Sequence, residues 1–194
     1  LIREFMELYR GKTLPAPRLQ YRDYAVWETG SERGNMLAKQ EAYWLKRMSG
    51  ELPVINLPID FPRTAESGFS GGHISFQLNE EDTAALKHTA AGEEATIFMA
   101  LLAVTNIFLW KISRQEDIIV GTPVAARRHE DLQEMIGMFV NTMALRHYPT
   151  GRISFKDFLL ATRDHSLKDF ENQEYPLESL VEKVAGVRES GRNP

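Results

Sequence analysis

An apolar run between Thr96 and Ser113 restricts the folds open to this chain more than any other feature. It contains FMALLAVTNIFLWKI, in which apolar residues lie almost all the way round a helix and only Thr105 and Asn106 interrupt them. The run is shorter than the roughly 20 apolar residues that a membrane-spanning helix needs. It therefore predicts a central core helix, against which the rest of the chain packs.

Two later segments predict strands. DIIVGTPV (117–124) is rich in β-branched residues and indicates a buried strand that enters a loop at Gly-Thr-Pro. IGMFVNT (136–142) begins a second strand, which we expect to continue to about Tyr148. Alternation along it places on one face Phe139, Asn141, Met143 and Leu145. A buried amide is unfavourable unless its donors and acceptors find partners, so Asn141 needs an explanation.

The rest of the pattern is mostly helical. Helices are predicted at 1–10, 21–28 and 34–50, after a cap at Asn79, after a cap at Ser154, and again from Pro176. Residues 51–63 are proline-rich and hence extended, and HISFQL (73–78) predicts a further short strand. The elements together indicate a mixed α/β chain that forms one lobe.

Composition excludes several classes of function. The chain has 194 residues, a formal net charge of −4 and no cysteine, so disulfides, thiolate zinc sites and a cysteine nucleophile are ruled out. The charge gives no electrostatic case for nucleic acid or an anionic membrane. The five histidines are scattered without metal-ligand spacing, and no phosphate loop or nucleophile elbow is present. We predict no metal site, no nucleic-acid partner and no membrane span.

Ordered motifs are more specific than composition. YRDYAVWE, LPIDFPR, DIIVGTPVAARRHEDLQEMIGMFVNTMALR, NQEYPLESLVEKV and RESGRNP follow one another along the whole chain. The series resembles the condensation domain of non-ribosomal peptide synthetases, whose strings are close to YxDFAVW, IGxFVNTxxxR, NQDYPFE and RDxSRNPL. Departures from these strings occur at Tyr24, Glu174, Leu177, Glu189 and Gly191. All but Gly191 are conservative.

The catalytic string of that family, HHxxxDG, does not occur in this sequence. In the family it shortly precedes a helix that resembles LIREFMELY, so the resemblance places the catalytic histidine upstream of Leu1. We therefore interpret residues 1–194 as the C-terminal lobe of a condensation domain, an excerpt of a larger synthetase. Residues 1–50 are its helical lead-in, and residues 51–194 are its two-layer α/β lobe, similar to a lobe of chloramphenicol acetyltransferase.

The resemblance implies a mechanism and partners. Two such lobes form a channel, in which the amine of a carrier-bound amino acid attacks a carrier-bound aminoacyl or peptidyl thioester. Both substrates arrive on phosphopantetheine, and no cofactor binds the domain itself. The implied partners are the upstream and downstream peptidyl carrier domains, the missing N-terminal lobe and an adenylation domain. The implied setting is cytoplasmic biosynthesis of secondary metabolites such as peptide antibiotics.

The resemblance assigns no catalytic residue to this chain, but it offers candidates for the channel or the lobe junction. These are Gly137, Asn141, Thr142, Arg146, Tyr21, Trp27 and Arg192. Asn141 either presents its amide to the channel or ties its strand to a neighbour, and Gly137 lets backbone approach closely.

Each of the other candidates has a plainer structural alternative. Tyr21, Tyr24 and Trp27 have the spacing of a helix face that packs in a core. Arg146 suits a salt bridge. Arg127 and Arg128 either meet an acidic carrier or are solvated, and Asn172–Glu174 suit capping of the helix that follows.

Other functions remain open at this point. Epimerisation and heterocyclisation domains are relatives of the same superfamily, and the string that separates them from condensation domains lies outside this sequence. A lobe without the histidine motif could instead be a non-catalytic docking module for carrier proteins. In either case, we expect a lobe taken alone to expose an apolar face and to self-associate.

Overall fold

The computed structural model describes residues 2–61, 71–127 and 129–184. Its helices are α1 (Ile2–Tyr9), α2 (Tyr21–Glu28), α3 (Ser31–Arg47), α4 (Glu80–Gly92), α5 (Ile97–Ser113), α6 (Phe155–Glu171) and α7 (Leu177–Val184). Strands β1 (Ile118–Ala125) and β2 (Val140–His147) pair antiparallel, and a short 3-10 helix (Glu130–Leu132) lies in their connection. The predicted mixed α/β architecture is present.

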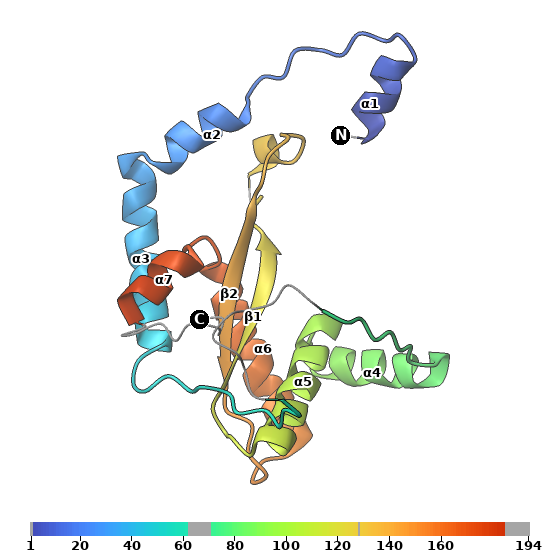
Figure 1. Ribbon diagram of the computed structural model, residues 1–194, viewed down its shortest axis with the longest axis vertical. Helices are drawn as coiled ribbons and strands as arrows, with labels where there is room; N and C mark the ends of the chain where they lie inside the picture. The colour runs from blue at the N-terminus through green and yellow to red at the C-terminus, as the bar shows by residue number, and fades with distance from the viewer. Residues whose placement is uncertain (1, 62–70, 128, 185–194) are drawn as a thin grey trace.

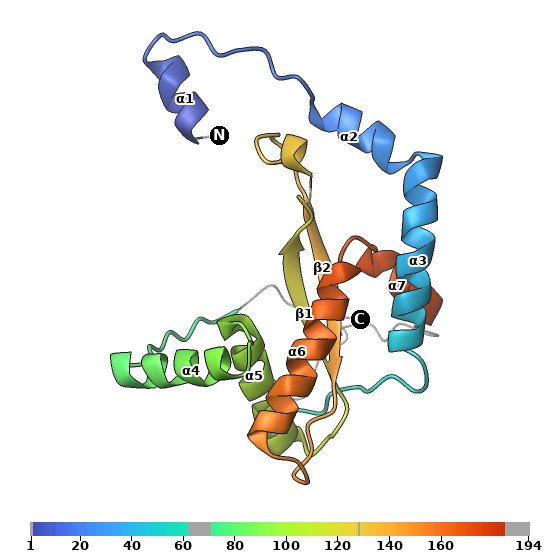
Figure 2. The ribbon, with the colours of Figure 1, turned by 180° about the vertical axis from the view of Figure 1, so that it is seen from behind.

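The two strands form a long arm along which the helices are arranged. Figures 1 and 2, taken from opposite sides, show α3 and α7 along one flank of the arm and α4 and α5 on the other, with α6 across one face of the strands. The main core lies between the strands and the helices on either side. Its buried side chains are Trp44, Met48, Leu102, Val124, Met143, Leu145, Tyr175 and Leu180.

Local sequence signals set the helix ends. The predicted caps are confirmed, because the side chain of Asn79 accepts a hydrogen bond from Asp82 N at 2.7 Å and that of Ser154 accepts one from Asp157 N at 3.1 Å. The predicted restart after Pro176 is also confirmed, with α7 beginning at Leu177. These bonds satisfy amide groups that have no partner within the helix.

One predicted strand is absent, and two predicted elements begin at other residues than expected. No strand partner lies beside residues 73–78 in the described part of the chain, and Ile74 and Phe76 there are 90% and 85% exposed. Strand β2 begins at Val140 rather than at 136, because the carbonyls just before it bind an arginine side chain instead of a strand. Helix α3 starts at Ser31, three residues before its predicted beginning.

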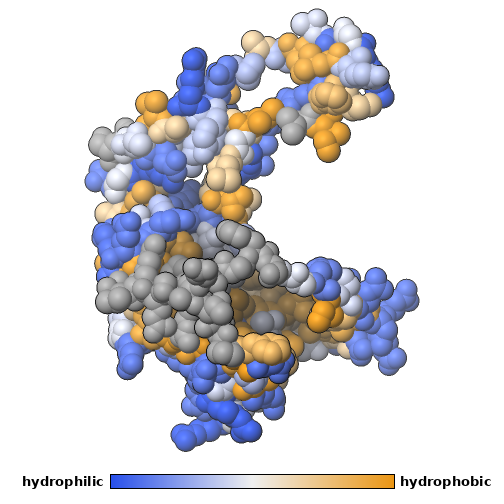
Figure 3. Space-filling view, in the orientation of Figure 1, coloured by the Kyte–Doolittle hydropathy of each residue, from blue (hydrophilic) through white to orange (hydrophobic). Residues whose placement is uncertain are grey.

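Helix α5 is buried on only one side. Its buried residues are Met99, Ala100, Leu102, Ala103 and Asn106. The other side exposes a stripe, called here the α5 stripe, that consists of Ile97, Leu101, Val104, Phe108 and Ile112. Apolar surface is visible over α5 and over α1 in Figure 3. The prediction of a central core helix is therefore correct for half of the helix surface.

The described residues contain neither a single helix suited to span a membrane nor a cluster of side chains suited to bind a metal ion. No single helix there is long and apolar enough to cross a membrane, whereas α4 and α5 together pass on length and composition but meet at a bend of 104°. The same residues contain no group of three or more histidine, aspartate or glutamate side chains placed to hold a metal ion.

Candidate functional site

The base of the site is a contact between α2 and the segment that leads into β2. The ring of Tyr21 lies on Gly137 so closely that an added Cβ would come within 2.1 Å of the ring Cδ2 atom. The Tyr21 hydroxyl donates to the carbonyl of Met138 at 3.0 Å, and its ring meets Phe139 edge-on at 5.2 Å between centroids. The close approach expected at Gly137 is made here by an aromatic ring.

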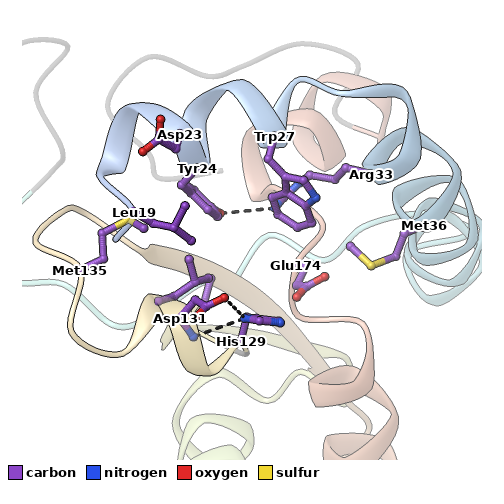
Figure 4. Close-up of a pocket in the computed structure, with 12 residues that line it drawn as sticks. Leu19, Asp23, Tyr24, Trp27, Arg33, Met36, His129, Asp131, Met135 and Glu174 are labelled. Atoms are coloured by element: carbon purple, nitrogen blue, oxygen red, sulfur yellow. Dashed lines mark hydrogen bonds and ion pairs between the residues drawn. The ribbon is translucent and has the colours of Figure 1, made fainter. Parts of the chain in front are cut away.

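A pocket of about 500 Å³, drawn in Figure 4, is lined by Tyr24, which also belongs to α2. Its lining residues are Leu19, Asp23, Tyr24, Trp27, Arg33, Met36, Ala126, His129, Asp131, Leu132, Met135 and Glu174. They come from α2 and the segment before it, α3, the β1–β2 connection and the segment before α7. Most of the lining is apolar, and Asp23, Asp131 and Glu174 add carboxylates to it. This composition suits an amphipathic group better than a small ion.

Two aromatic residues of α2 line the pocket in different ways. Tyr24 is buried against Phe139 at 4.7 Å between ring centroids, whereas Trp27 is 47% exposed. Beneath them lies the buried Arg33, whose guanidinium pairs with Glu28 at 3.0 Å and faces the Trp27 ring at 5.1 Å. Burial raises the pKa of the Tyr24 hydroxyl, so it stays protonated. Tyr24 thus belongs to the core, and Trp27 presents its ring to the pocket.

Both the nitrogen and the oxygen of the Asn141 side-chain amide have hydrogen-bond partners. Its Nδ2 donates to the carbonyls of Gln173 and Tyr175, each at 2.8 Å, and its Oδ1 accepts from the amides of Thr142 at 2.9 Å and Leu177 at 3.4 Å. Most of these groups lie in the NQEYPL segment, which is distant in sequence. The geometry therefore joins two of the family-like motifs through one side chain.

Arg146 lies at the far end of β2 and is almost fully buried. Its guanidinium binds both carboxylate oxygens of Asp117, at 2.9 and 2.6 Å, and the carbonyls of Ser49 and Glu51 at 2.9 Å. The hydrogen bond to Asp117 raises the pKa of Arg146. This residue ties the end of α3 to the start of β1, well away from the pocket, and its carboxylate partner lies in the same chain.

The structure does not bring all seven candidates together. Tyr21, Trp27, Gly137 and Asn141 lie around the α2 contact, the pocket and its neighbouring segment, and Thr142 follows directly. Arg146 lies elsewhere, and Arg192 is outside the described residues. Arg128 is also outside them.

Sequence reasoning underestimated Arg127. Its guanidinium donates to the carbonyls of Leu132, of Met135 at 2.7 Å and of Gly137 at 3.1 Å, and lies 4.1 Å from the centre of the Phe139 ring. A run of charges conceals such a role, because one arginine of the run folds back onto its own loop. The only available signal was its position at the end of VGTPVAAR.

A buried polar cluster between α3, α6 and β2 was also missed. The Tyr43 hydroxyl donates to Asp169 Oδ1 at 2.5 Å, and Arg47 lies 3.4 Å from the same oxygen. Burial raises the pKa of the Asp169 carboxyl, while burial and the nearby Arg47 lower the pKa of His147 to about 3. In the sequence, this cluster could have been recognised from His165 and Asp169, two titratable residues of α6 that lie four positions apart and therefore on one face of the helix.

The side chains of this site are better suited to orient reactants than to take part directly in a chemical step. No nucleophile paired with a base was found among the site residues above, and none of them forms a metal-binding group. The arrangement provides instead a rigid aromatic and backbone surface beside a pocket. An arrangement of this kind can orient reactants, which is a substantial source of rate acceleration.

The structure thus combines an α/β fold with an aromatic and backbone surface beside a pocket. The family model for the condensation domain matches residues 1–194. The chain therefore belongs to the condensation-domain family.

Relatives agree with this family, and a solved structure shares the fold. The chain is 45% identical over 193 residues to bacitracin synthase 1 of Bacillus licheniformis, and 43% identical over 194 residues to tyrocidine synthase 2 of Brevibacillus parabrevis. It is covered completely in both alignments and spans 4% and 5% of those proteins. The X-domain from teicoplanin biosynthesis shares the fold, with a TM-score of 0.84 and 22% identity over 96% of this chain and 43% of that one.

Proposed function

We propose that residues 1–194 are the C-terminal lobe of a condensation domain that forms an amide bond between two carrier-bound substrates. The observation that carries the proposal is the match to the condensation-domain family over the whole chain, with relatives that are non-ribosomal peptide synthetases. The acceptor amine attacks the donor thioester carbonyl, the new C–N bond forms and the C–S bond breaks. The donor's phosphopantetheine leaves as a thiol, which takes up the proton that the amine loses.

This lobe contributes a wall of the reaction channel. The Tyr21–Gly137 contact, the exposed ring of Trp27 and the β2 entry held by Asn141 support that role. Because both reactants arrive tethered, a wall that fixes their orientation removes much of the entropic barrier. The catalytic histidine lies outside this sequence, on the N-terminal lobe.

The partners follow from the same proposal. An upstream and a downstream peptidyl carrier domain present the substrates on phosphopantetheine, and an adenylation domain of the same synthetase loads them. The cofactor-like arm is thus a part of the substrate and does not reside in this lobe. The amino acids that are joined are specified elsewhere in the synthetase.

The test uses the complete condensation domain that contains this lobe, mixed with a donor carrier and an acceptor carrier loaded with different amino acids. We expect a dipeptidyl thioester on the acceptor carrier, detected by intact-protein mass spectrometry. Omission of either loaded carrier serves as the control and should abolish the product.

Three other outcomes correspond to the alternatives. Inversion of one carrier-bound residue without a new amide would indicate epimerisation, and an amide product that lacks one water would indicate heterocyclisation. Carrier binding without any product would indicate a docking module. Each of these results would contradict the proposed reaction.

A further inference from the structure

We propose that Arg127 is a positioning residue of the condensation reaction, which fixes the loop that carries Gly137 and leads to Asn141. The inference rests on the proposed function, and it assigns a task to a side chain whose contacts are loop carbonyls and the Phe139 ring. The task is to hold residues 129–139, called here the arm loop, in one conformation.

The arm loop lacks the regular backbone pairing of a strand, so its carbonyls need other donors. Arg127 supplies them, with Nη1 donating to Leu132 and Met135 and Nη2 donating to Gly137. A hydrogen bond also runs from the loop to Arg127, since the side chain of Gln133 donates to the Arg127 carbonyl at 2.7 Å. Backbone carbonyls need hydrogen-bond partners, and Arg127 supplies one to each of three loop carbonyls, of which those of Leu132 and Met135 are partly buried.

The chemistry selects arginine over lysine. Its planar guanidinium carries five donors in fixed directions, whereas a lysine ammonium is a compact charge on a flexible stem. The guanidinium of Arg127 also lies over the Phe139 ring, a contact that orients its plane. Among the described residues, Arg127 forms no ion pair, so its donors remain directed at the loop carbonyls.

The loop is closed at its base by a further bond, from the amide of Ala126 to the carbonyl of Phe139 at 2.6 Å. Gly137 lies just before this closure and packs under the Tyr21 ring, and Asn141 follows two residues after it. A change at Arg127 is therefore transmitted directly to the candidate channel surface. A displacement of about 1 Å at a positioning residue can reduce a rate by about 100-fold.

The test compares Arg127→Lys and Arg127→Met with the wild type in the complete domain assayed with two loaded carriers. The matched control is Arg152→Met, which removes the charge of an exposed arginine in the turn after β2. We expect kcat to fall by about 100-fold in both Arg127 variants, while KM for each carrier stays within about twofold. Arg152→Met should leave both parameters unchanged.

A second measurement separates positioning from general loss of structure. Amide hydrogen exchange should become faster in the arm loop of Arg127→Lys and remain unchanged in α3, α6 and the strands. In Arg127→Ala, added methylguanidinium should restore part of kcat, whereas methylammonium should not, because only the planar cation can bind several carbonyls.

Each remaining outcome contradicts the proposal. Unchanged kcat in Arg127→Lys would overturn it, and so would a loss that follows the unfolded fraction measured by thermal unfolding. If the wild-type domain itself forms no amide, the proposed function fails and the role in the reaction fails with it. Unchanged exchange in the arm loop would overturn the holding role independently.

Discussion

At the scale of single residues, Asn141 couples β2 to the segment before α7 through four hydrogen bonds. Replacement by leucine keeps a similar volume but leaves two carbonyls and two backbone amides without this partner. Each unsatisfied buried group costs about 1–3 kcal/mol, so we expect Asn141→Leu to lower the free energy of unfolding by roughly 3 kcal/mol in urea titrations. Asn35→Leu, on the exposed surface of α3, should change it by less than about 0.5 kcal/mol. Equal stability of the two variants would refute this account.

The Tyr21–Gly137 contact gives a second prediction at this scale. A methyl group at Gly137 would overlap the Tyr21 ring near its base, where the side chain cannot simply swing away. We expect Gly137→Ala to destabilise the domain by about 1–3 kcal/mol in thermal or urea unfolding. In a Tyr21→Ala background the same change should be nearly neutral, which makes the coupling energy the diagnostic quantity.

Gly34→Ala is the matched control for the glycine substitution. An added Cβ at that helical position meets nothing within 4 Å, so the change should be neutral or stabilising by up to about 1 kcal/mol. Additive effects of Gly137→Ala and Tyr21→Ala would show that the two residues do not press on each other.

Residue patterns foresaw part of this site. Alternation along 136–148 identified Asn141 as a polar group in need of partners, and the partners exist in the NQEYPL segment. The same reasoning offered for Arg127 only contact with an acidic carrier or solvation as a surface charge. A run of charged residues in the sequence does not indicate where each side chain points. The contacts of Arg127 with the arm loop depend on tertiary structure, which the local sequence does not report.

At the scale of elements, the caps and turns were readable because they depend on neighbours within a few residues. Residues 73–78 show the opposite case. Their alternating apolar side chains favour a strand, but a strand also needs a second backbone beside it, and no described segment provides one. An alternating pattern reports which residues share a face and says nothing of the partner.

The packing of β2 on α6 predicts a dependence on pH. His147 is 1% exposed, and burial holds its pKa at about 3, below the ordinary value of 6.5. Between about pH 6.5 and pH 3, His147 is therefore protonated in the unfolded chain and neutral in the folded one. The contribution of the neutral imidazole to the free energy of unfolding is complete above about pH 6.5 and is lost as the pH falls towards 3. His165 shifts in the same direction, whereas the raised pKa of Asp169 acts oppositely at the acid end.

The measurement is urea unfolding at a series of pH values. We expect the wild type to lose roughly 2 kcal/mol between about pH 7 and about pH 5, and His147→Leu to lose much less over the same range. His88→Gln, an exposed histidine on α4, should keep the wild-type slope. A His147→Leu slope equal to that of the wild type would show that this histidine is not the group responsible.

At the scale of the whole molecule, the α5 stripe shows that an apolar sequence pattern does not by itself determine which side chains the chain buries. The apolar run between Thr96 and Ser113 predicted a core helix, yet Phe108 in this stripe remains 59% exposed. Apolar side chains at helical spacing do not report whether the surface that covers them belongs to the same lobe. Exposed apolar surface of this kind favours association in water.

We therefore expect the isolated chain to self-associate, with a sedimentation coefficient that increases with protein concentration. The double change Leu101→Gln and Phe108→Gln should weaken association by about tenfold or more, because each removes a large apolar side chain from contact. Val26→Gln, which replaces a still more exposed apolar residue of α2, should leave association unchanged. In the complete condensation domain, we expect the double change to have no effect on sedimentation. A wild-type chain that stays monomeric at the highest soluble concentration would exclude the stripe as an associating surface, since its apolar side chains would then tolerate water without a partner.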